Sequence, residues 1–408
     1  MAEIKKVPAI RFKGFGDAWY EKHLSEIATM KARIGWQGLT KKEYLNSGNF
    51  YLITGTDFLD GTIDFRNCHY VNEDRYAQDA NIQINNDDVL ITKDGTIGKV
   101  AYVENLDKPA TLNAGVFVIR GKDKSICNLY LYQYLAAPFL LDFAYKQATG
   151  GTIKHLNQNV LVKFPVPISN INEQIQIGSY FQHLDKLISL HQAKVNKLTN
   201  LKKAMLEKIF PKQGEDLPEI RFQGFEGAWK KLKLGDIGTV LMNKRIFKSQ
   251  TSEIGDVPFY KIGTFGSEPN SYISRELFEE YKTKYPYPKK GDLLISAAGS
   301  IGKVVEYIGE DEYFQDSNIV WLDHDETLIN SFLKQFYLSV RWGGLEGSTI
   351  KRLYNKDILE TPINLPSIKE QIKIGDYFQN LDKIITLHQT ELEKLSHLKK
   401  ACLEKMFV

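Results

Sequence analysis

The sequence contains few cysteines and no long apolar run. Its 408 residues include three cysteines, Cys68, Cys127 and Cys402, without a C-x-x-C pair. This usage fits a reducing compartment and argues against a disulfide framework or a zinc site. No stretch approaches the roughly 20 apolar residues that a membrane span needs, and the opening segment lacks an apolar signal core. We therefore expect a soluble cytoplasmic protein without a membrane partner.

Neither the charge nor the histidines point to one ligand. The formal net charge is only +3 and the isoelectric point is near 8.4. Because no global field favours nucleic acid or membrane, any such partner must be bound locally. The eight histidines are scattered, without H-E-x-x-H or a similar ligand pair. The sequence therefore predicts no metal site.

Two glycine-lysine segments resemble phosphate-binding loops. "DGTIGKV" spans residues 94–100 and "AGSIGKV" spans residues 298–304. A P-loop has the pattern G-x-x-x-x-G-K followed by Ser or Thr. Here Lys93 and Ala297 occupy the place of the first glycine, and valine replaces the hydroxyl residue. The flanking apolar runs favour β-hairpins instead, so what needs explaining is the repetition.

The chain is an internal duplication. "PAIRFKGFGDAW" at 8–19 returns as "PEIRFQGFEGAW" at 218–229, and the 40 residues 171–210 return at 368–407 with 26 identities. Between these ends only islands correspond, among them "FYLITGT" with "FYKIGT" and "GGTIKHLN" with "GSTIKRLYN". We interpret this as one scaffold used twice, with surface loops suited to two different targets. Ordinary drift of loops after duplication is the alternative.

The two 40-residue blocks predict long helices. Asn170 and Ser367 each precede a glutamate by three residues, a pattern typical of a capping box. Apolar residues then recur at spacings of three and four, which predicts a coiled-coil seam. The predicted seam residues are Phe181, Leu184, Ile188, His191, Val195, Leu198, Phe378, Leu381, Ile385, His388, Leu392 and Leu395.

Two details of this seam follow from its side chains. Lys202 and Lys399 would enter it, so we expect a stutter near that point. We interpret His191 and His388 as packed or hydrogen-bonded rather than as metal ligands. One helix cannot bury its apolar stripe alone, and its simplest partner is its duplicate, paired antiparallel.

Each long helix follows a unit that mixes short strands with helices, and the run "LYLYQYLAAPFLLDFAYKQA" looks like one buried helical segment. The fold class is therefore α+β: two mixed α/β domains joined by two long antiparallel coiled-coil helices, with an internal pseudo-two-fold repeat. The expected parts are a first domain at 1–170, a first helix at 171–210, a linker at 211–217, a second domain at 218–367 and a second helix at 368–408.

This arrangement resembles the specificity subunit of type I restriction-modification systems. The resemblance covers essentially the whole chain and is carried by the two "EQI.IG.YFQ.LD" helix starts, the two "F.GF...W" openings and the two "IGK" hairpins. It implies a non-catalytic subunit that binds double-stranded DNA. Each domain, a target-recognition domain in this family, would bind one half of an asymmetric split target, and the paired helices would set the number of unread base pairs between the halves.

The resemblance also implies partner subunits. Two modification subunits would dock on the helices and methylate adenine with S-adenosylmethionine, and restriction subunits would cut DNA using ATP and Mg. The sequence agrees, because an adenine methyltransferase needs an N-P-P-Y or D-P-P-Y loop and no Pro-Pro dipeptide occurs. No cofactor is expected in this chain itself. A coiled-coil adaptor with duplicated β-rich protein-binding domains is the alternative.

The DNA-binding residues are sought among cations and amides on loops between strands, because phosphates fix register and base edges are read in the major groove. Candidates in the first domain are Lys31, Arg33, Gln37, Lys41, Lys93, Lys99 and Lys154. Candidates in the second domain are Lys244, Arg245, Lys248, Lys303, Lys351 and Arg352. Surface solubility explains a typical one of these as well as DNA contact does.

Overall fold

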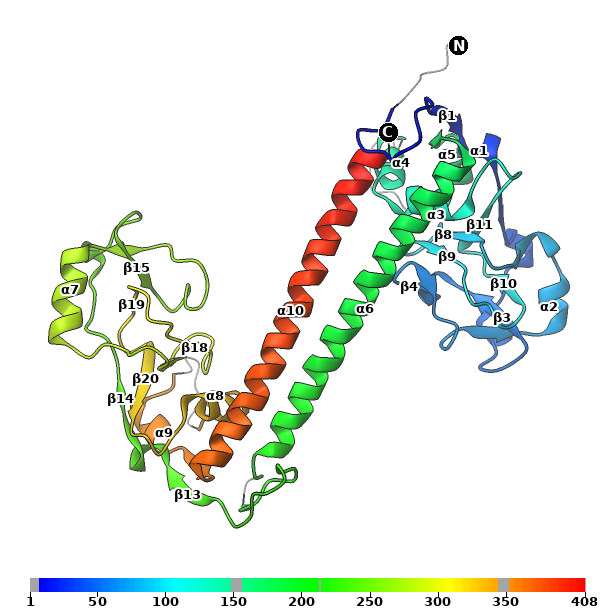
Figure 1. Cartoon of the computed structure of the whole chain (residues 1–408). Helices are drawn as coiled ribbons and strands as arrows, with labels where there is room; N and C mark the ends of the chain where they lie inside the picture. Colours follow the sequence, from blue (N-terminus) through cyan, green and yellow to red (C-terminus); the bar gives the residue numbers. More distant parts are fainter. Residues whose placement is uncertain (1–6, 148–155, 213, 344–351, 408) are drawn as a thin grey trace. The chain divides into compact units, whose positions relative to one another are not determined.

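The computed structural model divides the chain into two compact units. It describes residues 7–147, 156–212, 214–343 and 352–407. Unit 1 comprises residues 1–193 and 389–408, and unit 2 comprises residues 194–388. Each of the two long helices, labelled α6 and α10 in Figure 1, therefore contributes residues to both units.

Unit 1 is built from short strands, short helices and the first part of α6. In chain order its elements are β1 (Tyr20–His23), α1 (Leu24–Ile27), β2 (Ala28–Ala32), β3 (Phe50–Ile53), β4 (Phe58–Leu59), β5 (Thr62–Ile63), β6 (His69–Val71), α2 (Glu73–Ala77), β7 (Gln83–Ile84), β8 (Val89–Thr92), β9 (Val100–Tyr102), β10 (Ala110–Leu112), β11 (Val116–Gly121), α3 (Asn128–Ala136), α4 (Phe139–Gln147), α5 (Gln158–Leu161), β12 (Pro165–Ile168) and α6 (Ile171–Ile209).

Unit 2 repeats most of this order. Its elements are β13 (Lys230–Lys233), β14 (Gly238–Leu241), β15 (Val257–Tyr260), β16 (Tyr272–Ile273), α7 (Arg275–Lys284), β17 (Leu293–Ser296), β18 (Val304–Glu306), β19 (Tyr313–Phe314), β20 (Ile319–His324), α8 (Asn330–Ser339), α9 (Asn355–Leu359), β21 (Pro362–Leu365) and α10 (Ile368–Met406).

The sheets confirm the duplication strand by strand. An antiparallel sheet runs β2-β11-β8-β9 in unit 1 and β14-β20-β17-β18 in unit 2. A second sheet contains the parallel pair β3-β10 in unit 1 and the parallel pair β15-β19 in unit 2. A third pair joins the start of each domain to the strand before its long helix, β1 with β12 and β13 with β21. The predicted hairpins at the Gly-Lys segments are confirmed as β8-β9 and β17-β18.

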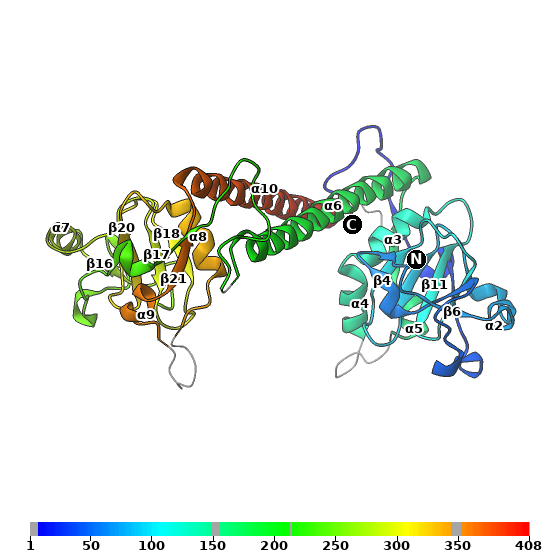
Figure 2. The same ribbon diagram turned by 90° about the horizontal axis from the view of Figure 1, so that it is seen from below.

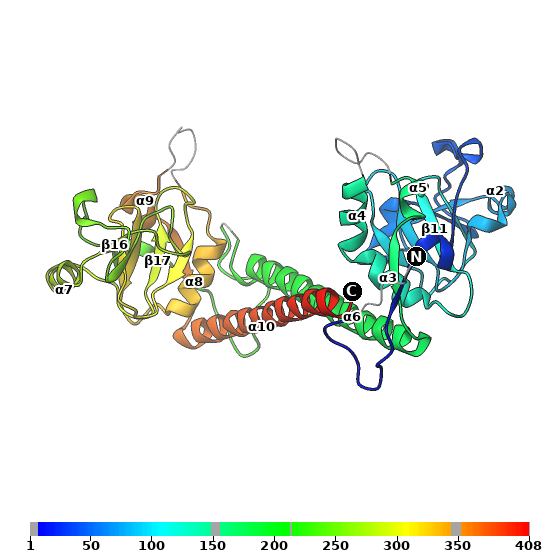
Figure 3. The same ribbon diagram turned by 90° about the horizontal axis from the view of Figure 1, so that it is seen from above.

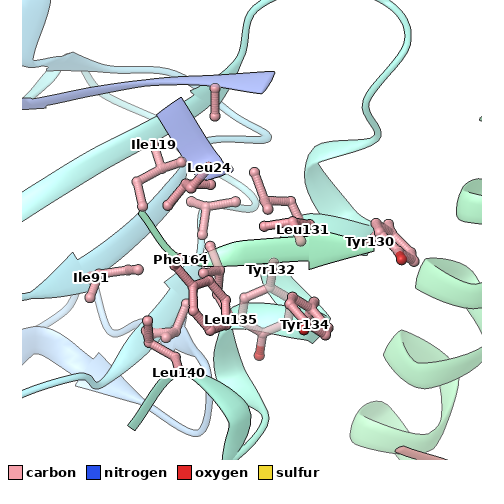
Figure 4. Close-up of a cluster of buried hydrophobic side chains, with 14 of the residues drawn as sticks. Leu24, Ile91, Ile119, Tyr130, Leu131, Tyr132, Tyr134, Leu135, Leu140 and Phe164 are labelled. Carbon is pink, nitrogen blue, oxygen red and sulfur yellow. The ribbon is translucent and has the colours of Figure 1, made fainter. Parts of the chain in front are cut away.

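A helix covers one face of the first sheet in each unit. In unit 1, α3 packs on β8 and β9, and in unit 2, α8 packs beside β18 (Figure 2, Figure 3). Figure 4 shows the aromatic side chains of α3, among them Tyr130 and Tyr134, with Leu24, Ile91 and Phe164 in the core of unit 1. The single helical run predicted from the sequence is two helices. Ala137 is extended and Pro138 cannot donate a helical hydrogen bond, so α3 ends there.

The long helices run in opposite directions, as predicted. In unit 1 the start of α6 packs on the end of α10, where the rings of Phe181 and Phe407 stack 5.7 Å apart. In unit 2 the end of α6 and the start of α10 share one core, which contains Ile209 and Phe378. Each domain core is thus completed by the last residues of the other long helix. All twelve residues predicted for the seam are buried or half-buried.

Two ion pairs join the long helices at equivalent positions. Lys399 donates to Asp185 in unit 1, and Lys202 Nζ lies 2.6 Å from Asp382 Oδ1 in unit 2. These lysines, which a stutter was expected to keep out of the seam, therefore take part in the contact between the helices. Both side chains are at least three-quarters buried, at 24% and 19% exposed.

The repeated sequence motifs meet at the start of each long helix. In unit 1, Arg11 donates two hydrogen bonds to Glu173, at 2.6 and 2.8 Å, and Trp19 Nε1 donates a third at 3.0 Å. In unit 2, Arg221 donates to both oxygens of Glu370 at 2.7 and 2.8 Å. The predicted capping boxes are wrong in this respect, because each glutamate binds a distant arginine rather than its own helix start. We call these arrangements the helix-start contacts.

The next residues of the same motif are fixed by packing. Gln174 accepts from the backbone N–H of Cys127 at 2.9 Å, and Gln371 accepts from that of Ile329 at the same distance. A Cβ on Gly178 would lie 2.9 Å from a backbone nitrogen of α3, so only glycine lets α6 approach α3 this closely. The motif E-Q-I-x-I-G is therefore the surface by which each long helix docks on its own domain.

Candidate nucleic-acid interface

Three connections meet at one end of the central sheet in each unit. In unit 1, the end of β2 lies beside the start of β11, which in turn lies beside the end of β8. In unit 2, the end of β14, the start of β20 and the end of β17 lie together in the same way. The loops that follow or precede these strands must therefore lie together. We call them the loop edge. In unit 1 the loop edge comprises residues 33–37, 93–99 and 113–115, and in unit 2 it comprises residues 242–248, 297–303 and 315–318.

The Gly-Lys hairpins are part of this edge and are built alike. Thr92 Oγ1 accepts from the backbone N–H of Lys99 at 2.9 Å, and Ser296 Oγ accepts from that of Lys303 at 2.9 Å. Gly98 has φ +74°, and a Cβ there would lie 2.5 Å from Leu141 of α4. The repeated "IGK" is therefore explained by hairpin geometry and packing, since a hydroxyl at the strand end and a left-handed glycine are both needed.

Two arginines lie at the loop edge of unit 2: Arg245 belongs to it, and Arg352 lies beside it, bridged to Ala298. Arg245 Nε donates to Asp316 Oδ2 at 2.8 Å, and Arg352 Nη2 donates to the carbonyl of Ser317 at 2.9 Å. The side chain of Arg245 is 60% exposed. Among the described residues, the remaining guanidinium N–H groups of both arginines have no protein acceptor. A fixed arginine with free donors suits acceptor pairs such as guanine O6/N7 or phosphate.

Exposed aromatic rings accompany these arginines. Tyr354 is 62% exposed and lies under the Arg352 guanidinium, at 6.0 Å from its ring centroid. Phe247 is 59% exposed in the connection that also carries Arg245. Lys244 Nζ lies over the ring of Tyr285 at 5.0 Å. Cations interleaved with exposed rings are typical of surfaces that bind nucleic acid.

The loop edge of unit 1 differs in chemistry. At the place of Asp316 stands Asn113, whose amide donates to the hydroxyl of Tyr44 at 2.7 Å. Lys93 Nζ lies over the ring of Phe117 at 5.4 Å. An amide and a tyrosine hydroxyl therefore replace the carboxylate that fixes Arg245. The two units would present different donors and acceptors to a common type of ligand.

The structure separates the sequence-predicted candidates by exposure. Lys31, Lys41, Lys99, Lys244, Arg245, Lys248 and Lys303 are exposed, and Lys93 and Arg352 are half-buried. Lys154 and Lys351 lie outside the described residues. Lys303 donates to the carbonyl of Phe265, so part of its hydrogen-bonding capacity is used within unit 2.

Arg33 and Gln37 are buried at 2% and 5% exposure. Arg33 Nε donates to the carbonyl of Leu112 at 2.8 Å, and its terminal nitrogens donate to Thr111 and Gln78 at 3.1 Å. Burial lowers the pKa of this guanidinium. Its hydrogen bonds tie the residue that follows β2 to β10. Sequence reasoning missed Asn113, Asp316 and Tyr354, because nothing in the repeat marks them.

A stripe of exposed apolar side chains recurs on both long helices. Its members are Ile175, Leu190 and Leu201 on α6 and, each 197 residues later, Ile372, Leu387 and Leu398 on α10, all between 42% and 64% exposed. Spacings of 15 and 11 residues are about 4.2 and 3.1 helical turns, so the members of each set lie within about a quarter turn of one another around an ideal helix. We call these six residues the outer stripe. Repeated exposed apolar residues are typical of a surface that binds another protein.

Within the described part of the chain, no helix combines the length and apolarity needed to span a membrane. Nor do His, Cys, Asp or Glu side chains of those residues gather in a group of three or more that could hold a metal ion.

Comparison with known proteins places the chain. A model of the family "Type I restriction modification DNA specificity domain" matches residues 17–200 and 226–397. A type I restriction enzyme specificity subunit of Haemophilus influenzae is 41% identical over 303 residues, 73% of this chain and 76% of that protein. The type I restriction enzyme MjaVIII specificity subunit of Methanocaldococcus jannaschii is 22% identical over 409 residues, 93% and 94% of the two chains.

The fold comparison agrees. The crystal structure of the type I restriction-modification S subunit from M. genitalium superposes with a TM-score of 0.65 at 17% identity, over 99% of both chains. With two matched family domains, each followed by a long helix, this chain belongs to the type I restriction-modification specificity subunits, the DNA-binding, non-catalytic subunits of those enzymes.

Proposed function

We propose that each unit reads one half of an asymmetric bipartite DNA target, through a target-recognition domain at residues 1–170 or 218–367. The observation that carries this proposal is the contrast between the loop edges. The strands that support them pair in the same order, yet the side chains they present differ, with Asp316 and Arg245 in unit 2 and Asn113 and Tyr44 in unit 1. Two different readers on one scaffold suit two different half-sites.

In unit 2 the two arginines are the main candidates for contacts with base edges. Asp316 fixes one side of the Arg245 guanidinium, so the free side forms a preorganised fork, and a fork of this kind matches the O6 and N7 acceptors of guanine. Arg352, which donates to the carbonyl of Ser317 next to Asp316, would serve a second base or a phosphate. Lys244, Lys248 and Lys303 would fix register through phosphates. We infer that the half-site read by unit 2 contains guanine.

In unit 1 the proposed contacts are the exposed or half-buried cations Lys31, Lys41, Lys93 and Lys99. Asn113 is a candidate for reading adenine, because a side-chain amide pairs with N6 and N7 of that base. In the structure its amide donates to Tyr44, so the two side chains would have to move together on binding. Arg33 and Gln37 would act by holding the scaffold, because their side chains are buried.

The paired long helices would fix the spacer between the half-sites. Their contact is apolar along the predicted seam and carries an ion pair at each of two equivalent positions. A rigid separator of this kind sets a distance, and B-DNA offers about 3.4 Å per base pair along its axis. A change in helix length would then change the spacer without changing either half-site.

The outer stripe would dock two modification subunits, one on each long helix. Its six exposed apolar residues recur at an offset of 197, as two copies of one partner require. The modification subunits would supply S-adenosylmethionine and adenine methylation, and restriction subunits would supply ATP- and Mg-dependent cleavage.

One experiment tests the proposal. The chain is expressed with its modification subunit in a host that lacks DNA methylation, and long-read sequencing maps N6-methyladenine. We expect one split asymmetric motif. Replacement of residues 12–170 by another recognition domain should change only one half of it. A contiguous motif, or a change in both halves, would refute two independent readers. Absence of methylation with both the wild-type chain and the chain with the replaced domain would refute the proposed role itself.

A further inference from the structure

Unit 1 contains a groove that the DNA-binding role does not use. Its cavity volume is about 480 Å³, and it lies between the β4-β5 hairpin, α3 and the first part of α6. Figure 1 shows β4 beside α6. Its exposed lining is mainly apolar, and two of its residues, Leu59 and Leu190, are 49% and 64% exposed. An open groove bordered by exposed leucines is suited to take up apolar side chains.

The hairpin wall of the groove is rigid. Asp60 and Gly61 form its turn, with φ of 49° and 80°, as a two-residue hairpin turn of type I′ requires. The carbonyl of Gly61 accepts from the backbone N–H of Tyr102 at 2.9 Å. A Cβ on Gly61 would lie 2.2 Å from the hydroxyl of Tyr132, so the turn sits directly on that ring. The groove is therefore preformed, and binding would cost little ordering of its walls.

The charge of the groove is negative. Asp60, Glu104 and Asp185 line it together with Lys186, whose Nζ lies 3.7 Å from Glu104 Oε1, and Asp185 accepts from Lys399. Glu104 is held in place by Gln182, which donates at 2.5 Å. Asp60 has no hydrogen-bond or ion-pair partner among the described residues. A bound segment would therefore be favoured if it carried lysine or arginine beside its apolar side chain.

The described residues of unit 2 lack the elements that form this groove in unit 1. At the places of Tyr102 and Tyr132 stand Glu306 and Lys334, which form an ion pair at 3.2 Å. Residues 261–271, all described, contain no strand between β15 and β16, so no hairpin corresponds to β4-β5. Only the helix side is retained, since Leu387 on α10 matches Leu190 and is 59% exposed.

We propose that this groove anchors an amphipathic segment of one modification subunit, with an apolar side chain between Leu59 and Leu190 and a lysine or arginine against Asp60. The inference rests on the proposed docking at the outer stripe, because Leu190 belongs to both surfaces and makes them continuous. The two docking positions are then unequal. The modification subunit at α6 is bound first and released last, and the one at α10 lacks the anchor.

The test uses the full chain with its modification subunit, measured by mass photometry during dilution. Leu59→Glu places a negative charge at the apolar end of the groove, outside the outer stripe. Ile254→Glu is the matched control, because Ile254 is an 89% exposed apolar residue of unit 2. We expect the wild type and I254E to lose one modification subunit well before the other. L59E should weaken the tighter site by about tenfold, so that both subunits leave together.

A second pair of variants guards against misfolding of the hairpin. Leu190→Glu and Leu387→Glu change equivalent stripe residues, and only the first lies in the groove. L190E should weaken binding more than L387E. Equal effects, or an L59E complex that dissociates like the wild type, would overturn the anchor while leaving stripe docking intact. A wild-type chain that binds no modification subunit would instead refute the proposed function, and loss of a chain dimer in L59E would assign the groove to a second copy.

Discussion

The start of each long helix and the loop edge of each domain have diverged to different extents. At the helix starts, Arg11 with Glu173 and Arg221 with Glu370 form the same two hydrogen bonds to within 0.1 Å. At the loop edges the pairing strands are equivalent, but the side chains are not. Buried ion pairs tolerate little change, because removal of one partner leaves the other charge unpaired. Loops tolerate replacement, so new specificity can arise there without loss of the fold.

The largest expected effect comes from mutating the helix-start contacts, which are alike in the two units. Glu173 is buried and accepts three hydrogen bonds, whereas Glu370 accepts two from Arg221. Glu173→Ala should destabilise unit 1 by about 3–5 kcal/mol, because it leaves Arg11 nearly buried without its partner. Glu370→Ala should cost somewhat less. Urea denaturation followed by circular dichroism measures both. A loss below about 1 kcal/mol for E173A would mean that the helix start is held by packing alone.

The two repeated tryptophans mark a difference between the helix-start contacts of the two units. Trp19 Nε1 donates to Glu173 at 3.0 Å, whereas Trp229 Nε1 is buried without a partner among the described residues. Trp19→Phe should cost about 1.5–3 kcal/mol more than Trp229→Phe, because only the first loses a hydrogen bond to a charged group. Both rings are almost fully buried, so the packing change is matched. Equal losses of urea stability would show that the indole nitrogen contributes nothing.

These contacts also show what could be predicted from the sequence. Duplication, helix length and the apolar seam are encoded by neighbours in the chain, at spacings that one helix imposes, and the fold class followed from them. The pairing of Glu173 with Arg11 joins residues 162 positions apart, and local capping chemistry offered a simpler partner for the same glutamate. The division of one predicted helix into α3 and α4 was signalled by Pro138 and was overlooked.

The candidate interface was less accessible to prediction, because exposure is decided by the tertiary structure. Arg33 and Arg245 looked alike as loop cations. In the structure Arg33 is buried and hydrogen-bonded to β10, while Arg245 is held at the surface by Asp316. Neither the groove of unit 1 nor the lack of an equivalent hairpin among the described residues of unit 2 is visible until Tyr102 and Tyr132 are seen on neighbouring elements.

The difference between the two loop edges is tested at Arg245, whose guanidinium donates to Asp316. Arg245→Ala should weaken binding of the cognate site by about 1–3 kcal/mol and relax discrimination at one guanine in the half-site of unit 2 only. Asp316→Asn should act in the same direction but less strongly, because it removes only the group that orients Arg245. Lys248→Ala is the control for a simple loss of charge. A uniform weakening at all sequences, with a smaller salt dependence, would assign Arg245 to phosphate instead.

The smallest expected effect concerns the ion pairs between the long helices, which are equivalent in position but not in surroundings. Asp185 accepts from Lys399 and also from Gln133 Nε2 at 2.9 Å, which ties α3 to α6, whereas Asp382 is paired with Lys202. Asp382→Asn should cost about 0.2–1 kcal/mol, as partly exposed pairs do. Asp185→Asn should cost more, by roughly one further hydrogen bond of 0.5–1.5 kcal/mol. If urea denaturation gives equal losses for both variants, the bond to Gln133 adds nothing, and the two ends of the helix pair are energetically as well as geometrically alike.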